Sequence, residues 1–162
     1  MSCTEEKSIG EAPADEAIIR MTRVVAAPRD LVWASWTDVS RVSQWWGPNG
    51  FTTTTHAHEL RPGGTWSFTM HGPDGTDYIN RVVYEQIEPP ARLEYRHYGP
   101  EDPEETPHFR SRIGFDETEG GTRITLTLTC RSIAYRDGLV RFGAIEGGRQ
   151  TLARFAALVE GG

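Results

Sequence analysis

The amino-acid sequence predicts an α+β fold in which a curved antiparallel sheet wraps around one long C-terminal helix. Successive segments alternate apolar and polar residues with the period of two that β-strands require. The 162 residues include 17 glycines and 10 prolines, enough to supply tight turns between many short strands. Near the C-terminus the apolar residues instead recur at helical spacing. Strands joined by tight turns form an antiparallel sheet, whose apolar face one amphipathic helix can cover.

The N-terminal segment, residues 1–16, is predicted to be a disordered acidic tail because it is rich in glutamate and poor in large apolar side chains. Residues 17–162 are enough for one hydrophobic core and are predicted to form a single domain. Within it, the β-branched run over residues 17–26 predicts the first strand.

Two short helices are predicted after this strand. Pro28 suits the start of a helix over residues 29–37. Asp38 can cap the N-terminus of a second helix over residues 38–46, which a run of glycine and proline then ends.

The middle of the chain reads as a series of strands. Residues 122–130 alternate most clearly, with Ile124, Leu126 and Leu128 on one face and threonines on the other. The predicted strands are residues 51–60, 65–71, 78–87, 92–98, 109–115 and 122–130.

The long helix is predicted over residues 137–160. Gly147 and Gly148 fall in its middle, where each glycine costs roughly 1 kcal/mol relative to alanine. Either the helix kinks at this pair, or something needs the room beside it.

The composition argues against several functional classes. A net charge of −6 is unfavourable for a protein that binds nucleic acid or an anionic membrane surface. The sequence has neither the apolar core of a signal peptide nor a run long enough to span a bilayer, and its two cysteines provide no disulfide framework. These features predict a cytoplasmic protein without nucleic-acid or membrane partners. Nucleophile-elbow and phosphate-loop motifs are absent, and no cofactor is expected.

Seven segments, in this order and at this spacing, resemble the START-like (SRPBCC) superfamily. More narrowly, they resemble the bacterial family named after the activator of the heat-shock-protein ATPase. The segments are Ala26–Asp38, Gln44–Phe51, Leu60–Met70, Gly72–Tyr78, Ile87–Tyr95, Gly120–Thr129 and Gly147–Glu160. The resemblance implies a helix-grip fold with a deep apolar cavity between sheet and helix.

Two positions depart from the family pattern. The family commonly has tryptophan where this chain has Gly148, and often has glycine where it has Val82. Both changes imply a cavity of different shape from that of the commoner family members.

The candidate ligand-binding residues are large apolar side chains in the inward register, with polar groups among them that could orient a ligand. Tyr78, Asn80, His97 and Ser111 are the expected orienting groups, and Gly148 is expected to leave space. The complete set is Trp36, Trp46, Trp66, Phe68, Met70, Tyr78, Asn80, Tyr95, His97, Phe109, Ser111, Ile113, Gly148 and Leu152.

Histidines raise two further possibilities. His56 and His58 share a strand face, but no third ligand is evident, so no metal site is predicted. His97 is a weak candidate for a general acid or base, since no carboxylate that could orient it is evident. Of the adjacent tryptophans Trp45 and Trp46, one is expected in the core and one at the cavity.

These observations favour a protein that binds an apolar small molecule, aromatic, polyketide-like or acyl, and they favour a non-enzymatic role. A small cyclase- or hydrolase-type enzyme that uses the same cavity is the first alternative. A chaperone-associated module that stimulates a heat-shock-protein ATPase is the second. A homodimer and a chaperone contact both stay open.

Overall fold

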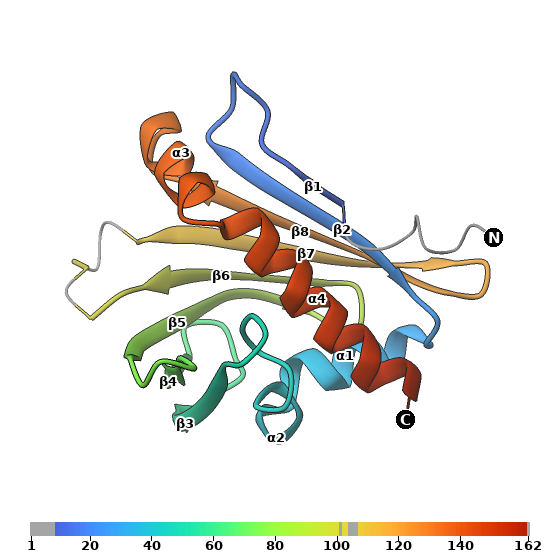
Figure 1. Ribbon diagram of the computed structural model, residues 1–162. Coiled ribbons are helices and arrows are strands. Elements are labelled where there is room, and N and C mark those ends of the chain that lie inside the picture. Colours follow the sequence, from blue (N-terminus) through green and yellow to red (C-terminus); the bar gives the residue numbers. More distant parts are fainter. Residues whose placement is uncertain (1–8, 101, 104–106, 162) are drawn as a thin grey trace.

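The computed structural model describes residues 9–100, 102–103 and 107–161, which form one antiparallel sheet and four helices (Figure 1). Along the sheet the strand order is β1-β2-β8-β7-β6-β5-β4-β3. The strands are β1 (Ile9–Glu11), β2 (Ile18–Val25), β3 (Thr52–His58), β4 (Thr65–His71), β5 (Asp77–Glu88), β6 (Arg92–Tyr98), β7 (Phe109–Thr118) and β8 (Gly121–Cys130). The helices are α1 (Arg29–Thr37), α2 (Val39–Val42), α3 (Ile133–Arg141) and α4 (Ala144–Gly161).

The sheet curves around α4, which crosses its inner face, and α1 and α2 lie near the C-terminal end of that helix (Figure 1). From β3 to β8 each strand pairs with the next along the chain, and short turns join β5 to β6 and β7 to β8. On the other side of β8 lies β2, which pairs with β8 and with the edge strand β1. The predicted helix-grip architecture is confirmed.

The core lies where α1, α4 and the segment after α2 meet the sheet. Phe155 of α4 is fully buried between Trp36 and Trp45, with ring centroids 5.1 Å and 4.7 Å away. On α4 the buried residues Leu152, Phe155, Ala156 and Val159 follow the spacing of one helix face. Burial of these aromatic rings removes large apolar surfaces from water and stabilises this end of the domain.

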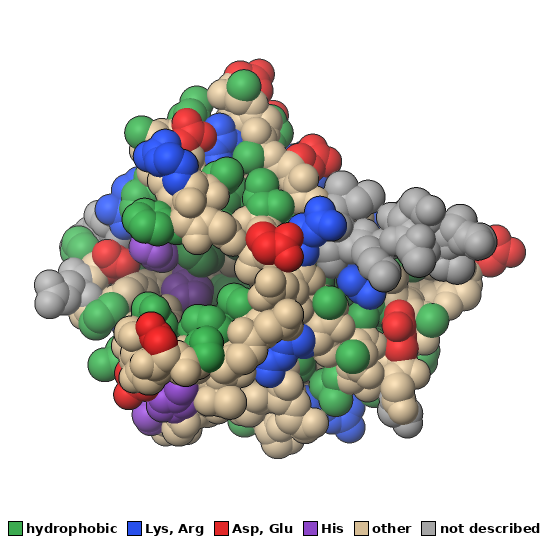
Figure 2. Space-filling model, in the orientation of Figure 1, with side chains coloured by type: hydrophobic (Ala, Val, Ile, Leu, Met, Phe, Trp, Pro, Cys, Tyr) green, Lys and Arg blue, Asp and Glu red, His purple; other side chains and the backbone are tan. Residues whose placement is uncertain are grey.

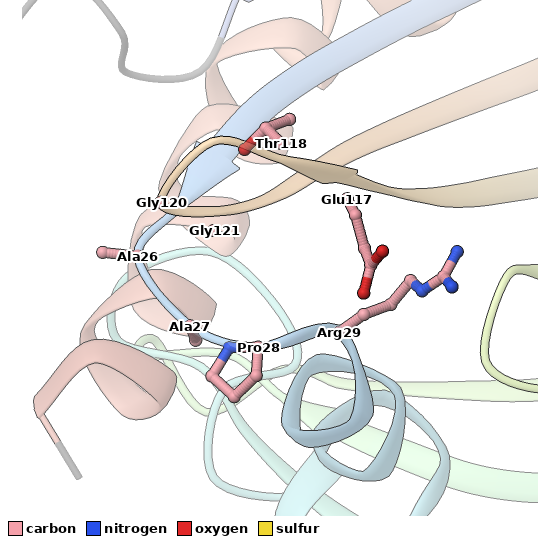
Figure 3. Close-up of a pocket in the computed structure, with 8 residues that line it drawn as sticks. All are labelled: Ala26, Ala27, Pro28, Arg29, Glu117, Thr118, Gly120 and Gly121. Carbon is pink, nitrogen blue, oxygen red and sulfur yellow. The ribbon is translucent and has the colours of Figure 1, made fainter.

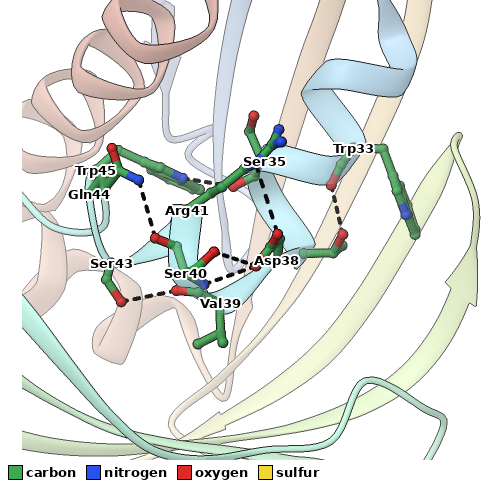
Figure 4. Close-up of polar contacts among 10 residues, drawn as sticks. Trp33, Ser35, Asp38, Val39, Ser40, Arg41, Ser43, Gln44 and Trp45 are labelled. Atoms are coloured by element: carbon green, nitrogen blue, oxygen red, sulfur yellow. Dashed lines mark hydrogen bonds and ion pairs between the residues drawn. The ribbon is translucent and has the colours of Figure 1, made fainter.

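The connection between α1 and α2 is held by short polar contacts (Figure 4). The carboxylate of Asp38 accepts hydrogen bonds from the Ser40 backbone N–H at 3.0 Å and from its hydroxyl at 2.8 Å. These bonds lower the pKa of Asp38 and cap α2 as predicted. The indole N–H of Trp45 donates to the Ser35 carbonyl at 2.9 Å. The helix itself is shorter than predicted, because i→i−3 bonds turn the chain after Val42.

The C-terminal helix differs from its prediction. Two helices, α3 and α4, replace one helix over residues 137–160. The break falls at Phe142 and Gly143, and Gly143 has φ +92°, a left-handed conformation that glycine adopts without strain. Gly147 and Gly148, where a kink was considered, lie inside α4.

The N-terminal segment also differs from its prediction. Residues 1–8 lie outside the described residues, but Ile9–Glu11 form β1 and pair with β2. Gly10 lies close to α4, since a Cβ added there would meet Ile145 Cγ2 at 2.6 Å. A residue without a side chain therefore lets this edge strand approach the helix.

Candidate functional site

A cavity of about 410 Å³ opens between the sheet, α3, α4 and residues 45–48. Figure 2 shows it as a hollow bordered by hydrophobic side chains, with histidine side chains beside it. Its described lining consists of Trp36, Trp45, Trp46, Gly47, Pro48, Met70, Tyr95, His97, Phe109, Ser111, Leu126, Leu128, Leu139, Phe142, Gly143, Ala144, Gly147, Gly148, Thr151 and Leu152. These residues include no aspartate, glutamate, lysine or arginine, and His97 would be charged only if it were protonated. The volume suits a small-molecule ligand.

Most of the predicted ligand-binding residues meet at this cavity. Those that line it are Trp36, Trp46, Met70, Tyr95, His97, Phe109, Ser111, Gly148 and Leu152. Cross-strand pairing explains the grouping, because Tyr95 faces Ser111 and His97 faces Phe109 across β6 and β7.

Five predicted residues do not line the cavity. Trp66 and Phe68 are stacked with centroids 3.9 Å apart, and the edge of Trp46 packs against both. Ile113 is fully buried in the core, and Tyr78 is exposed. Asn80 reaches the site only indirectly, through a hydrogen bond to His97. The inward register was right for Trp66, Phe68 and Ile113, but other side chains cover them.

The cavity also has walls that sequence reasoning left out of the site. Leu126 and Leu128 come from β8, and their alternation was the available signal. Leu139 and Phe142 come from α3 and its end. The Phe142 side chain is 93% exposed at the rim, an uncommon place for a large apolar residue.

The glycine pair of α4 leaves room on the cavity side of the helix. An added Cβ at Gly147 would meet only Pro48 Cγ, at 3.5 Å. At Gly148 it would touch the flexible end of Met21, at 3.0 Å. Of the two alternatives raised by the sequence, the structure supports the need for space.

The part of the cavity wall formed by Gly47 and Pro48 is bonded to α4 by an arginine. Arg154 Nη1 donates to the carbonyl oxygens of Gly47 and Pro48, both at 2.9 Å. The Gln150 amide oxygen accepts from the Asn49 backbone N–H at 3.1 Å. These bonds hold residues 45–48 beside the helix. Trp45 is fully buried and Trp46 is half-buried, and both tryptophans line the cavity.

His97 is a neutral polar group in the cavity wall. Its Nε2 lies 2.8 Å from Asn80 Oδ1, and the Asn80 amide nitrogen donates to the Tyr78 carbonyl at 3.0 Å. The amide oxygen therefore faces the ring, so Nε2 carries the proton and Nδ1 is the acceptor. Burial, together with the neighbouring His108, lowers the pKa of His97 to about 3, and the ring is uncharged at neutral pH.

Tyr95 and Ser111 form the most polar part of the wall. Their side chains are 4% and 3% exposed. Burial raises the pKa of the Tyr95 hydroxyl, while the polar groups of Trp36 and Ser111 oppose this rise. The Trp36 N–H thus lies near the Tyr95 oxygen, but its geometry makes no hydrogen bond, and among the described residues it has no partner.

The histidine pair His56 and His58 forms no shared site. A bulge in β3 falls at His56, which has no partner in the β3–β4 register, whereas His58 pairs with Trp66. The His56 ring bonds the Thr69 hydroxyl and the His58 ring bonds the Tyr84 hydroxyl. Within the described ranges, no three histidine, cysteine, aspartate or glutamate side chains gather as a metal site would require.

A second concavity, of about 400 Å³, lies between the start of α1 and the β7–β8 turn (Figure 3). It is lined by Ala26, Ala27, Pro28, Arg29, Glu117, Thr118, Gly120 and Gly121. A Cβ at Gly121 would meet the Val25 carbonyl at 2.0 Å, so glycine is required where this turn packs against β2. The groove is open and mixed in polarity, and it lacks the apolar walls of the first cavity.

In the part of the chain that the structure describes, no helix combines the length and apolar character needed to span a bilayer.

Comparisons with known proteins agree with the fold. The sequence model of the Activator of Hsp90 ATPase homolog 1-like family matches residues 26–160. A crystallised protein from Mycobacterium smegmatis is 26% identical over 93% of this chain and 95% of its own, with a TM-score of 0.83. A solution structure of a protein from Arthrobacter aurescens is 24% identical over 95% of this chain and 92% of its own, with a TM-score of 0.85.

A protein from Aeromonas hydrophila described as AHSA1-like is 20% identical over 89% of this chain and 92% of its own, with a TM-score of 0.66. Among curated proteins no match was found.

Proposed function

We propose a function from one premise, that the chain belongs to the Activator of Hsp90 ATPase homolog 1-like family, whose fold is in general a ligand-binding fold. The proposed function is the binding of an uncharged, largely apolar small molecule in the cavity between the sheet and α4. The apolar cavity of about 410 Å³, whose described lining contains no aspartate, glutamate, lysine or arginine, supports this proposal most directly.

The state of His97 favours binding over acid–base catalysis. A histidine with a pKa of about 3 is not in its cationic, acidic form at neutral pH and is a weak base, so it is poorly suited to act as a general acid or a general base. No acidic side chain is among the described residues of the wall to raise that pKa. The ring is better suited to accept a hydrogen bond at Nδ1.

The proposal can be tested with the fluorescent probe N-phenyl-1-naphthylamine, which is neutral and apolar. We expect saturable, equimolar binding with enhanced emission, and a co-purified ligand detected by native mass spectrometry would identify the natural occupant. If the folded protein neither binds the probe nor retains a ligand, the proposed function is wrong.

Filling the cavity should weaken this binding. Gly147→Leu adds an apolar side chain to a helix position on the cavity wall where the nearest atom leaves room for a Cβ. We expect the dissociation constant for the probe to rise about tenfold, because the new side chain takes up ligand volume.

The matched control is Gly138→Leu. Gly138 is also helical and has room for a Cβ, with Arg141 Nη2 at 3.9 Å, but it is not part of the described lining. Its affinity should stay within about twofold of the wild-type value. Equal weakening by both changes would place the probe outside this cavity.

A further inference from the structure

Apart from His97 and Thr151, the polar groups of the cavity wall lie together between α1 and the strands β6 and β7. Tyr95 and Ser111 are direct cross-strand neighbours, and both line the cavity beside Trp36. All three side chains are at least nine-tenths buried. The rest of the wall is mainly tryptophan, leucine, phenylalanine and glycine, so this cluster gives the cavity one polar end.

The cluster is left incompletely satisfied by the protein. The indole N–H of Trp36 has no hydrogen-bond partner among the described residues, and a buried donor without a partner costs about 1–3 kcal/mol. An indole N–H can only donate, whereas the hydroxyls of Tyr95 and Ser111 can donate or accept. The Trp36 N–H lies near the Tyr95 oxygen without a hydrogen bond to it, and the Tyr95 hydroxyl, which lines the cavity, can direct its own proton toward a ligand.

The charge of the wall limits what the cluster can bind. A carboxylate or an ammonium group enclosed here would have no oppositely charged side chain among the described lining residues. Burial of an unpaired charge is far more costly than burial of a neutral polar group. A carbonyl oxygen is neutral and has two lone pairs, which two adjacent hydroxyl donors can satisfy.

We infer that Tyr95 and Ser111 anchor a neutral carbonyl oxygen of the ligand, beside the unpartnered N–H of Trp36. The ligand class is therefore a ketone, ester, amide or quinone with an apolar body, rather than a free acid or an amine. This inference rests on the proposed function, because it assigns the polar end of the same cavity. It extends the sequence-based view, in which Ser111 was one of the expected orienting groups.

The test compares three naphthalenes of similar shape as competitors of N-phenyl-1-naphthylamine at pH 7.5. They are 2-acetylnaphthalene, 2-ethylnaphthalene and 2-naphthoate, which differ in carrying a ketone, a hydrocarbon and a carboxylate. We expect the ketone to compete about tenfold more tightly than the other two, the effect of one good buried hydrogen bond.

Tyr95→Phe removes only the hydroxyl and should reduce the preference for the ketone to less than about twofold. Binding of N-phenyl-1-naphthylamine is titrated for this variant as well, so that each competitor is compared with the variant's own affinity for the probe. Tyr84→Phe is the matched control, because Tyr84 is the buried cross-strand neighbour of Tyr95 but bonds His58 and does not line the cavity. That variant should keep the full preference.

The outcomes separate the two claims. If the probe binds but all three naphthalenes compete equally, or 2-naphthoate competes best, the carbonyl anchor is wrong while ligand binding stands. A ketone preference that survives in Tyr95→Phe also overturns the anchor. If the probe does not bind the wild-type protein, the proposed function fails and the anchor fails with it.

Discussion

Acidification from pH 7 to pH 4 is expected to remove about 3 kcal/mol of unfolding free energy through His97 alone. In the native protein its pKa is lowered to about 3 by burial and by His108, with Asp102 opposing the shift. In the unfolded chain the ring titrates near its ordinary value of 6.5. Between these values the unfolded state binds the extra proton, so stability falls as the pH falls through this window.

The measurement is urea unfolding of the wild-type protein and of His97→Gln at half-unit steps from pH 7 to pH 4. Glutamine does not titrate, and its amide can still donate to Asn80. The variant is expected to lose about 3 kcal/mol less than the wild type over this range. His58 and His108, whose pKa values burial also lowers, are present in both proteins and cancel in the comparison. Parallel pH profiles would mean that His97 reaches water in the native state.

The sequence was sufficient to predict the sheet and most of its inward register. The alternation of Leu126 and Leu128, and of Tyr95 and His97, follows directly from side chains pointing to opposite faces of a strand. Each of these four residues is found on the cavity wall. A period of two therefore predicts on which face of the sheet a side chain lies. It does not predict whether other side chains pack over that side chain.

That difference explains the errors in the candidate site. Trp66 and Phe68 point inward as expected, yet Trp46 packs over them. Whether an inward residue meets a ligand or another ring depends on a helix and a loop far away in sequence. The rim at Phe142 was missed because it depends on where Gly143 breaks the helix.

Prediction of the polar end of the cavity would also have required the register between the strands. Nothing local to Tyr95 or Ser111 indicates that the two residues face each other. The pairing follows from the β6–β7 register, and a bulge in β5 between Tyr84 and Gln86 shifts the pairing on the other side of β6. A bulge of this kind changes which residues are opposed without a clear mark in composition.

The N-terminal segment shows a different limit. Residues 1–16 lack the apolar side chains for a core of their own, which favours disorder. The structure nonetheless holds residues 13–18 through a single arginine of α3. Arg136 is 2% exposed, and its Nη1 lies 2.8–2.9 Å from the carbonyl oxygens of Pro13, Glu16 and Ile18. A charged residue in a helical pattern is ordinarily expected to face solvent, so this role could not be predicted.

Replacing that arginine by methionine is expected to lower the unfolding free energy by about 3 kcal/mol. Arg136→Met keeps much of the apolar stem but removes the donor from three carbonyls and leaves Asp137 without its 2.8 Å partner. Because Leu139 on the same helix lines the cavity, loosening of α3 should also weaken binding of N-phenyl-1-naphthylamine. Urea unfolding and the probe titration measure the two effects.

Arg141→Met is the control for charge and helix composition, because Arg141 is exposed at the end of the same helix. Its effect should stay within about 0.5 kcal/mol, as is usual at surface positions. Arg136→Lys distinguishes charge from geometry, since one ammonium keeps the charge but lacks the planar fork of the guanidinium. Recovery of less than half of the lost stability by lysine would show that the hydrogen-bond geometry dominates. Equal losses in Arg136→Met and Arg141→Met would instead show that the three carbonyl contacts contribute nothing specific.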